Sequence, residues 1–176
     1  LLNIFTVKIC LFLSKIKHRT LIYSGNHEMQ TKTHSILFDL RDEITRCNSL
    51  VGIVTSTSFI DPETGKPIFD IIDYMDIQKE VTPKSNIAFT HVRGKIDPHV
   101  IPETELEKFS QYNIVFAGDL HSYQNSQLNI MYPGSPLTTS MHRTRQTDSN
   151  GMFLIDFSSS NSIEWINLSH LPQLIK

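Results

Sequence analysis

The sequence predicts a layered α/β protein, and three features of the chain support this class. Residues 1–17 place apolar side chains at helical spacing, as expected for a helix that buries one face against a sheet. Short apolar runs at 20–24, 86–90 and 112–117 each stop at a polar cluster, which is typical of buried strands. The stretch 151–157 shows the alternation expected of a strand with one buried face.

In the first half of the chain, helices and strands are expected to alternate. The helix at 1–17 leads into the strand at 20–24, and a helix-like stretch runs from about Lys32 to Cys47. A strand follows near 50–55. Residues Ser58 to Tyr74 predict a hairpin, because their centre is dense in turn residues and is flanked by β-prone runs.

The second half is expected to consist mainly of strands. Residues 92–102 read as a loop, with two prolines and a glycine. Pro102-Glu103-Thr104-Glu105 predicts the start of a helix that continues to about Ser110, because proline and acidic residues favour the first helical turn. The expected strands are 86–90, 112–117, 128–132, 151–157 and 162–168.

Length and composition exclude several classes of protein. The 176 residues suffice for one ordinary domain, and a net charge of −2 provides no overall basic field for nucleic acid. Cys10 and Cys47 form no disulfide framework, so a reducing cytoplasm is the expected location. The apolar run at 1–13 is too short to span a bilayer and precedes its basic residues. A core helix is therefore favoured over a membrane anchor or signal peptide, and no membrane association is expected.

Four polar clusters stand where strands are expected to end. Because clefts form at the carboxyl edge of open α/β sheets, these side chains are expected to gather there. Divalent Mn, Fe or Zn accepts amide oxygen, imidazole and carboxylate together, and two such ions about 3.5–4 Å apart can clamp a phosphoester. The sequence therefore predicts a metal site. The clusters are Gly25-Asn26-His27-Glu28, Thr90-His91, Gly118-Asp119-Leu120-His121 and Tyr132-Pro133-Gly134-Ser135.

The order of these motifs resembles that of the calcineurin-like metallophosphoesterases. Within that superfamily the chain looks most like the SbcD-type nuclease subunits of DNA recombination and repair complexes, in the versions carried by large phages. About 64 residues separate His27 from His91, and a hairpin fills part of that gap, as in this branch. The resemblance implies that residues 1–176 form one partial nuclease domain, a four-layer αββα sandwich that lacks its first strands.

The resemblance also implies a set of metal ligands. Carried over to this sequence, Asn26, His91 and Asp119 would hold the second metal ion, and His121 would bind the first. The expected cofactor is Mn²⁺, bound as two ions in the intact family and in at most a partial site here.

Residues that contact the substrate follow from the same comparison. His27 is expected to contact the phosphate and to help the leaving oxygen depart as a general acid. Ser135 belongs to the loop that borders the substrate groove. Arg93 and Arg143 lie in two small basic clusters, which either follow a DNA backbone or are simply solvated.

Two departures from the family pattern affect the expected activity. The family usually has His where this chain has Asp119, and the shorter, charged side chain alters metal choice or spacing. The opening motifs, Asp-x-His and Gly-Asp-x-x-Asp, do not occur before Gly25. We therefore expect an N-terminally truncated, poor or inactive nuclease unless a separate N-terminal fragment supplies those ligands. The C-terminal DNA-capping region of the family is also expected to be absent, with weak DNA affinity as the result.

Other interpretations of the motifs stay open. Asp119-Leu120-His121 can itself be an opening Asp-x-His, in a permuted order. Asn26 and Glu28 can form a turn that caps the next helix, and an isolated His91 can be structural.

Three functions follow from these observations. The first is a metal-dependent DNA exo/endonuclease subunit that hydrolyses phosphodiester bonds with an SMC-like ATPase of the SbcC type, with homodimerisation as a further expectation. The second is a phosphoesterase of the same fold that acts on small phosphodiesters or phosphoproteins. The third is a non-catalytic remnant or assembly module.

Overall fold

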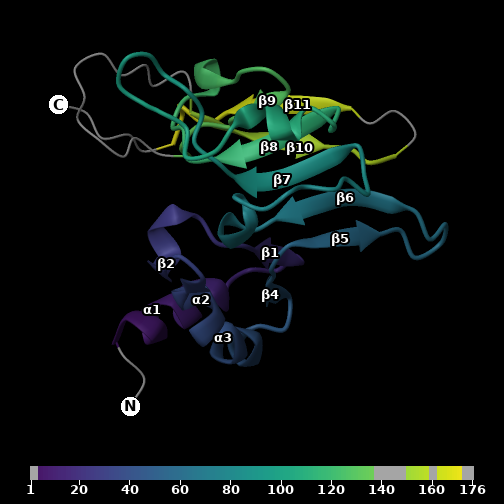
Figure 1. Cartoon of the computed structure of the whole chain (residues 1–176). Coiled ribbons are helices and arrows are strands. Elements are labelled where there is room, and N and C mark those ends of the chain that lie inside the picture. The colour runs from purple at the N-terminus through teal and green to yellow at the C-terminus, as the bar shows by residue number, and fades with distance from the viewer. Residues whose placement is uncertain (1–3, 137–149, 159–161, 172–176) are drawn as a thin grey trace.

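The centre of the fold is a five-stranded mixed sheet. The computed structural model describes residues 4–136, 150–158 and 162–171. The first pair of strands in this sheet is antiparallel and the remaining pairs are parallel, so the carboxyl ends of four strands share one edge (Figure 1). In spatial order the strands are β5 (Thr57–Ile60), β6 (Pro67–Ile72), β7 (Ile87–His91), β8 (Ile114–Gly118) and β9 (Ile130–Met131).

The predicted hairpin is confirmed as β5 and β6. Its turn is closed by hydrogen bonds from Asp61 N to Lys66 O and from Gly65 N to Asp61 O, both 2.8 Å long. Gly65 has φ 68°, a left-handed conformation that glycine adopts without steric cost. The turn residues of the sequence therefore act through specific local geometry.

One face of the sheet is covered by helical turns and packs the larger core. Along β7, Ala88 and Thr90 are fully buried on this face. They lie beneath η2 (Tyr74–Asp76) and η3 (Leu106–Phe109). Phe109, the last residue of η3, is also fully buried. The predicted α-helix at 102–110 is wrong in extent, since only the 3₁₀ turn η3 forms. Its two buried residues, Leu106 and Phe109, are three apart, as a 3₁₀ turn requires to face one side.

The other face of the sheet carries a row of phenylalanine rings in contact, one from each of four neighbouring strands. Ring centroids are 4.7 Å apart for Phe59 and Phe69, 5.1 Å for Phe69 and Phe89, and 5.2 Å for Phe89 and Phe116. Phe153 continues the row at 4.9 Å from Phe116. It belongs to the antiparallel pair β10 (Gly151–Ile155) and β11 (Ile163–Asn167), which confirms the two C-terminal strands that the sequence predicts.

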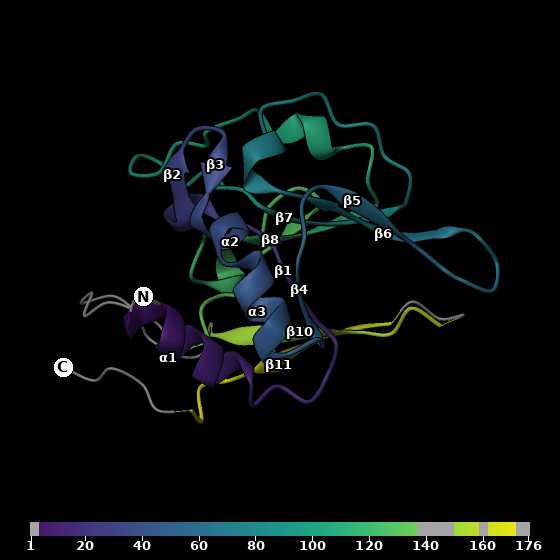
Figure 2. The same cartoon turned by 90° about the horizontal axis from the view of Figure 1, so that it is seen from below.

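A second unit packs on the same side of the sheet as β10 and β11 (Figure 2). It consists of two parallel strands, β1 (Thr20–Ile22) and β4 (Val51–Ile53), beside α1 (Ile4–Leu13) and α3 (Arg41–Cys47). Its core contains Leu13, Ile44, Val51 and Ile53. Strands near 20–24 and 50–55 and a helix before them are thus confirmed.

The helix predicted from Lys32 to Cys47 is wrong in its first part. Residues 29–35 form a small hairpin of β2 (Met29–Thr31) and β3 (His34–Ser35). Helix α2 (Ile36–Asp39) begins only after Ser35, whose Oγ accepts from Leu37 N at 3.3 Å as an N-cap, and α3 follows it. The Ser35 cap thus marks the start of the helix at Ile36, whereas the apolar spacing of the sequence predicted a start at Lys32.

The α/β class predicted from the sequence is confirmed, with few helices and one multi-stranded sheet. Within the described ranges, no helix is long and apolar enough to cross a membrane.

Candidate metal and phosphoester site

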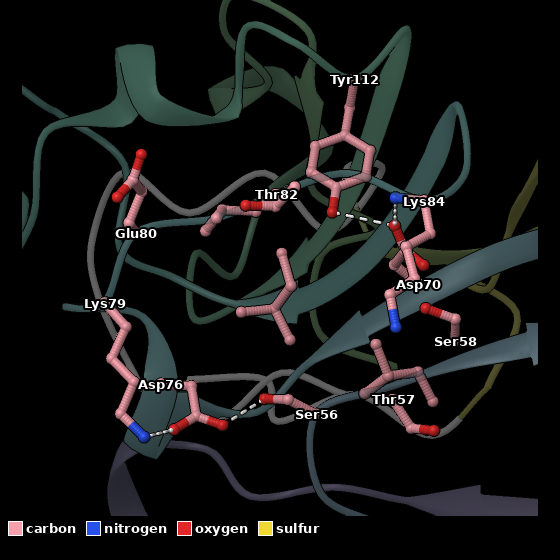
Figure 3. Close-up of a pocket in the computed structure, with 13 residues that line it drawn as sticks. Ser56, Thr57, Ser58, Asp70, Asp76, Lys79, Glu80, Thr82, Lys84 and Tyr112 are labelled. Carbon is pink, nitrogen blue, oxygen red and sulfur yellow. Dashed lines mark hydrogen bonds and ion pairs between the residues drawn. The ribbon is translucent and has the colours of Figure 1, made fainter.

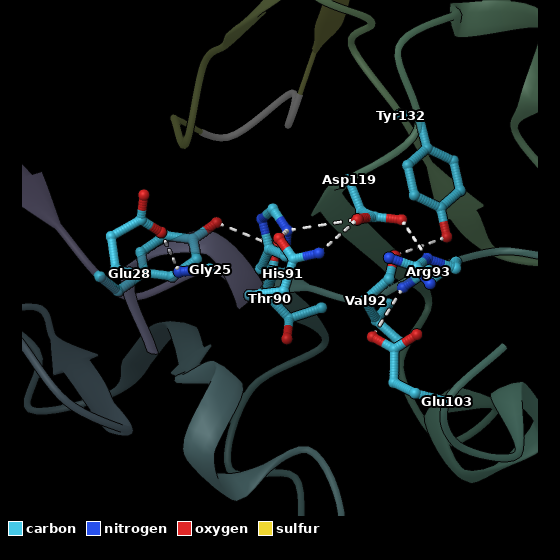
Figure 4. A network of polar contacts seen from close by, with 11 residues as sticks. Gly25, Glu28, Thr90, His91, Val92, Arg93, Glu103, Asp119 and Tyr132 are labelled. Atoms are coloured by element: carbon cyan, nitrogen blue, oxygen red, sulfur yellow. Dashed lines mark hydrogen bonds and ion pairs between the residues drawn. The ribbon is translucent and has the colours of Figure 1, made fainter. Parts of the chain in front are cut away.

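Three of the predicted metal ligands meet at the carboxyl edge of the sheet, where Figure 4 shows His91 beside Asp119 and hydrogen bonds join Asn26 to both. His91 ends β7, Asp119 follows β8, and Asn26 opens the 3₁₀ turn η1 (Asn26–Glu28). His91 Nε2 lies 3.1 Å from Asn26 Oδ1 and 3.6 Å from Asp119 Oδ1. Asn26 Nδ2 donates to Asp119 Oδ1 at 3.2 Å. We refer to Asn26, His91 and Asp119 as the strand-end cluster.

The segment after β1 is held against the main sheet by backbone and side-chain hydrogen bonds. Tyr23 Oη donates to Thr90 O at 3.1 Å, and Ser24 N donates to the buried carboxylate of Asp73 at 3.0 Å. Gly25 N donates to Glu28 Oε2 at 2.9 Å, which closes the turn that contains Asn26. Glu28 therefore closes its own turn and does not cap the next helix, which begins after Ser35, and the closed turn brings Asn26 to His91.

His91 is seated between two glycine backbones. A Cβ added to Gly25 would lie 2.8 Å from the His91 ring, and one added to Gly118 would lie 2.6 Å from His91 Nδ1. Tyr74 contacts the ring edge-on, with centroids 5.9 Å apart. Both glycines stand in the motifs that the sequence singled out, but their part in seating the imidazole becomes visible only in the tertiary structure.

Asp119 is the charged centre of the cluster and is held in an unusual backbone conformation. Its φ is 99°, in the left-handed region that non-glycine residues rarely adopt. Arg93 Nε donates to Asp119 Oδ2 at 3.0 Å. Burial alone would raise the pKa of Asp119, but hydrogen bonds from His91 and Arg93 and the Arg93 charge outweigh burial and lower the pKa to about 2. The carboxylate is therefore ionised at neutral pH and available as an anionic ligand.

Arg93 is itself positioned by contacts that the sequence did not indicate. Its backbone N donates to Glu103 Oε1 at 3.1 Å, and the hydrogen bond with Asp119 raises the pKa of its guanidinium. Fully buried Tyr132 donates to Val92 O at 3.0 Å, which fixes the chain immediately before Arg93 (Figure 4). Tyr132 was part of a predicted strand-end motif and Glu103 of a predicted helix start, but neither pattern indicated a contact with the Arg93 segment.

The donor atoms of the strand-end cluster fit a divalent transition-metal ion. Ligands held at about 2.1 Å from one ion lie roughly 3–3.5 Å from each other. The separation of 3.1 Å between His91 Nε2 and Asn26 Oδ1 lies within that range, and the 3.6 Å to Asp119 Oδ1 lies just above it. Amide oxygen, imidazole and carboxylate suit Mn, Fe or Zn. Across 4–136, 150–158 and 162–171, no group of three or more His, Cys, Asp or Glu residues forms a metal site, so the amide of Asn26 is needed to complete this set.

The structure gives less information on how the other predicted site residues lie relative to the strand-end cluster. The His121 side chain is exposed, and none of the three contacts that join the strand-end cluster involves its imidazole. His121 O accepts from the backbone N of Ser135 at 3.3 Å, and Ser135 is buried, so the Pro-Gly-Ser loop lies beside the residues after β8. His27 is exposed on η1, and Arg143 lies outside the described residues.

A cavity of about 270 Å³ lies elsewhere on the sheet and shares no residue with the strand-end cluster (Figure 3). Its buried carboxylate, Asp70, accepts from Lys84 N at 2.9 Å, Ser85 N at 3.1 Å and Tyr112 Oη at 3.0 Å. Burial and the Asp70 charge raise the pKa of Tyr112, so this hydroxyl stays a donor. Asp70 thus ties the 84–85 segment and Tyr112 to β6, a structural role.

The chain is thus a mixed α/β protein that brings an amide, an imidazole and a carboxylate together at the carboxyl edge of its main sheet. No protein-family model matches the chain. The chain is 46% identical over 171 residues to the "Probable exonuclease subunit 1" of Escherichia phage T5. The match covers 94% of this chain and 51% of the phage T5 protein, so the chain spans about half the length of this relative.

Proposed function

We propose that this chain is part of a phage-type, metal-dependent DNA nuclease subunit of the calcineurin-like metallophosphoesterase kind. The observation that carries the proposal is the convergence of Asn26, His91 and Asp119, which are far apart in the sequence, at spacings suited to one metal ion. The similarity to a protein named as an exonuclease subunit supports a nuclease role. Mn²⁺ is the proposed ion, and His121 is the proposed link to a second ion.

In this proposal the chain's own residues bind and orient the phosphodiester. A divalent ion at the strand-end cluster would supply Lewis-acid polarisation of a phosphoryl oxygen. Arg93, held by Asp119 and Glu103, presents a cation beside that cluster and is suited to a phosphate oxygen. His27, exposed on the turn next to Asn26, is proposed to donate a proton to the leaving oxygen. Ser135 and Arg143 are proposed to border the path of the DNA.

The word "subunit" in the relative's name supports a partner protein, and we propose an SMC-like ATPase of the SbcC type. DNA is the proposed substrate, in the host cytoplasm, and a homodimer is part of the same proposal. The small phosphodiesterase and the non-catalytic module remain the alternatives that the experiments below separate.

We further propose that β1–β4 and β10–β11 are two parts of one sheet, completed by additional polypeptide into a four-layer sandwich. An apolar cavity of about 480 Å³ lies beside β10, lined by Met152 and Phe153 of β10, by Phe89 and Phe116 of the main sheet, and by Tyr23, which follows β1. Unpaired strand edges and exposed apolar side chains are the usual sites of strand addition. The phage T5 relative, about half of which is matched, has enough further chain to supply such strands.

Calorimetry with Mn²⁺ tests the metal site first. We expect wild-type chain to bind the ion and His91→Ala to lose at least tenfold in affinity, because the central donor is removed. His99→Ala, an exposed histidine outside the cluster, is the matched control and should bind like wild type. Equal affinity in wild type and His91→Ala would contradict the proposed site.

Hydrolysis assays then separate the candidate functions. Mn²⁺-dependent cleavage of DNA that is lost in His91→Ala would support the nuclease. Cleavage of bis-p-nitrophenyl phosphate with no cleavage of DNA would favour the small phosphodiesterase. Metal binding without hydrolysis of either, even after addition of the unmatched half of the phage T5 protein, would favour the non-catalytic module.

A further inference from the structure

A groove beside the strand-end cluster has no role in the site described so far. It has a volume of about 480 Å³ and lies between the β2–β3 hairpin and η2. At one end it is lined by Asn26, whose amide belongs to the strand-end cluster. Tyr74, another lining residue, contacts the His91 ring edge-on at 5.9 Å. The groove and the cluster therefore share a wall, and a chain bound at the cluster would continue into the groove.

The groove combines an apolar floor with a polar rim. Tyr74, Met75, Met29 and fully buried Ile77 form the apolar part. An aromatic ring and two thioethers present the flat, polarisable surface on which a nucleobase stacks.

The rim supplies hydrogen-bond donors and a cation. Gln30, Lys32 and Gln78 are exposed there, and Gln78 Nε2 also donates to Glu103 O at 2.7 Å. In the described part of the chain, no residue hydrogen-bonds or pairs with the Lys32 ammonium, which leaves it available for a phosphate. The acidic residue of η2, Asp76, is engaged by Lys79 and Ser56 at the other cavity and does not compete for this cation.

We propose that this groove binds the nucleotide next to the cleaved phosphodiester in a DNA strand. The base stacks on Tyr74 between Met29 and Met75, and Lys32 binds the adjoining phosphate. The proposal rests on the proposed nuclease function for the identity of the substrate, since the groove by itself selects a flat, anionic group. The volume lies within the usual range for small-molecule sites, about 300–1,000 Å³, which accommodates one nucleotide.

The test is binding of a fluorescein-labelled single-stranded oligonucleotide to the full chain in EDTA, measured by anisotropy at several salt concentrations. We expect Lys32→Ala to weaken binding severalfold and to lower the slope of log affinity against log salt by about 0.7, the value for one phosphate contact on a single strand. Lys66→Ala, at the exposed β5–β6 turn, carries the same change of charge and should keep the wild-type slope. Equal slopes in wild type and Lys32→Ala would overturn the proposal.

Photocrosslinking locates the base. An oligonucleotide with one 5-iodouracil should crosslink to peptides that contain Tyr74 or residues 29–32, and crosslinks only elsewhere would overturn the proposal. The readouts are independent of catalysis. Crosslinking in the groove without DNA hydrolysis, even after addition of the unmatched half of the phage T5 protein, would support the groove and contradict the proposed function. Mn²⁺-dependent DNA hydrolysis without crosslinks at Tyr74 or residues 29–32 would contradict the groove alone.

Discussion

The imidazole of His91 lies directly against the backbone of Gly118, so close that a Cβ on that glycine would sit 2.6 Å from His91 Nδ1. The two residues are opposite one another in the register of β7 and β8. Side-chain size at 118 therefore decides where the central donor of the strand-end cluster points.

Gly118→Ala is expected to displace the His91 ring and to weaken Mn²⁺ binding at least tenfold. Overpacking of this kind costs about 1–3 kcal/mol in stability. Calorimetry and urea denaturation measure the two effects. Gly52→Ala in β4 is the control, because its added Cβ would meet only Leu21 at an ordinary 3.7 Å. Unchanged metal affinity in Gly118→Ala would contradict the seating of His91 described above.

Asp119→Asn tests the charge at the centre of the cluster. Asparagine tolerates the left-handed backbone at φ 99°, so the loop should keep its conformation while the anionic ligand is lost. We expect at least a tenfold loss of Mn²⁺ affinity and a loss of at most about 1 kcal/mol in stability, because the ion pair with the partly exposed Arg93 is removed. Asp156→Asn, exposed in a turn, should change neither quantity. Wild-type Mn²⁺ affinity in Asp119→Asn would exclude Asp119 as a ligand.

Ionisation of Tyr23 should make the folded protein less stable as the pH becomes alkaline. Burial, and then the Asp73 charge, raise the pKa of Tyr23 to about 12, above the unfolded value of about 10. Its contribution to stability is therefore fully present below pH 10 and is lost as the pH rises towards 12, because only the unfolded chain ionises readily. Tyr23→Phe should lose about 1 kcal/mol at pH 7, with its hydrogen bond to Thr90 O, and should show a shallower loss between pH 10 and 12. Urea denaturation at several pH values measures this, and an unchanged alkaline slope would contradict it.

The outer apolar surface of β10 and α1 should drive self-association of the isolated chain. Phe12 is 69% exposed and Leu154 is 54% exposed, and Leu21 and Met152 are exposed with them. We expect Leu154→Ser with Met152→Ser to reduce association in sedimentation experiments and to lower binding of an apolar dye. Ile101→Ser, at a loop residue that is 78% exposed, is the control. If Ile101→Ser reduced association as much as the double variant, the outer surface of β10 would not be the surface through which the chain self-associates.

Most elements of the fold could be predicted because their signals are local. The β5–β6 hairpin follows from its turn residues, and the strands that end at His91 and Gly118 follow from apolar runs that stop at polar residues. The helix predicted over 32–47 started too early because apolar spacing cannot reveal a short hairpin, whereas the Ser35 cap marks the actual start. Candidate ligands could be named for the same reason, as strand ends are visible in a sequence.

The α/β class, the residues at the strand ends and the chemical types of ligand they offer follow from the amino-acid sequence, since each depends on neighbours along the chain. Which of these residues meet depends on the tertiary structure. Asn26 reaches His91 because Tyr23 and Ser24 bind Thr90 O and the Asp73 carboxylate, which lie 67 and 49 residues further along the chain. His91 fits there because Gly25 and Gly118 lack side chains, and the pKa of Asp119 stays low despite burial because His91 and Arg93, the latter held by Glu103, face it. These contacts depend on packing between distant segments, which no local pattern encodes.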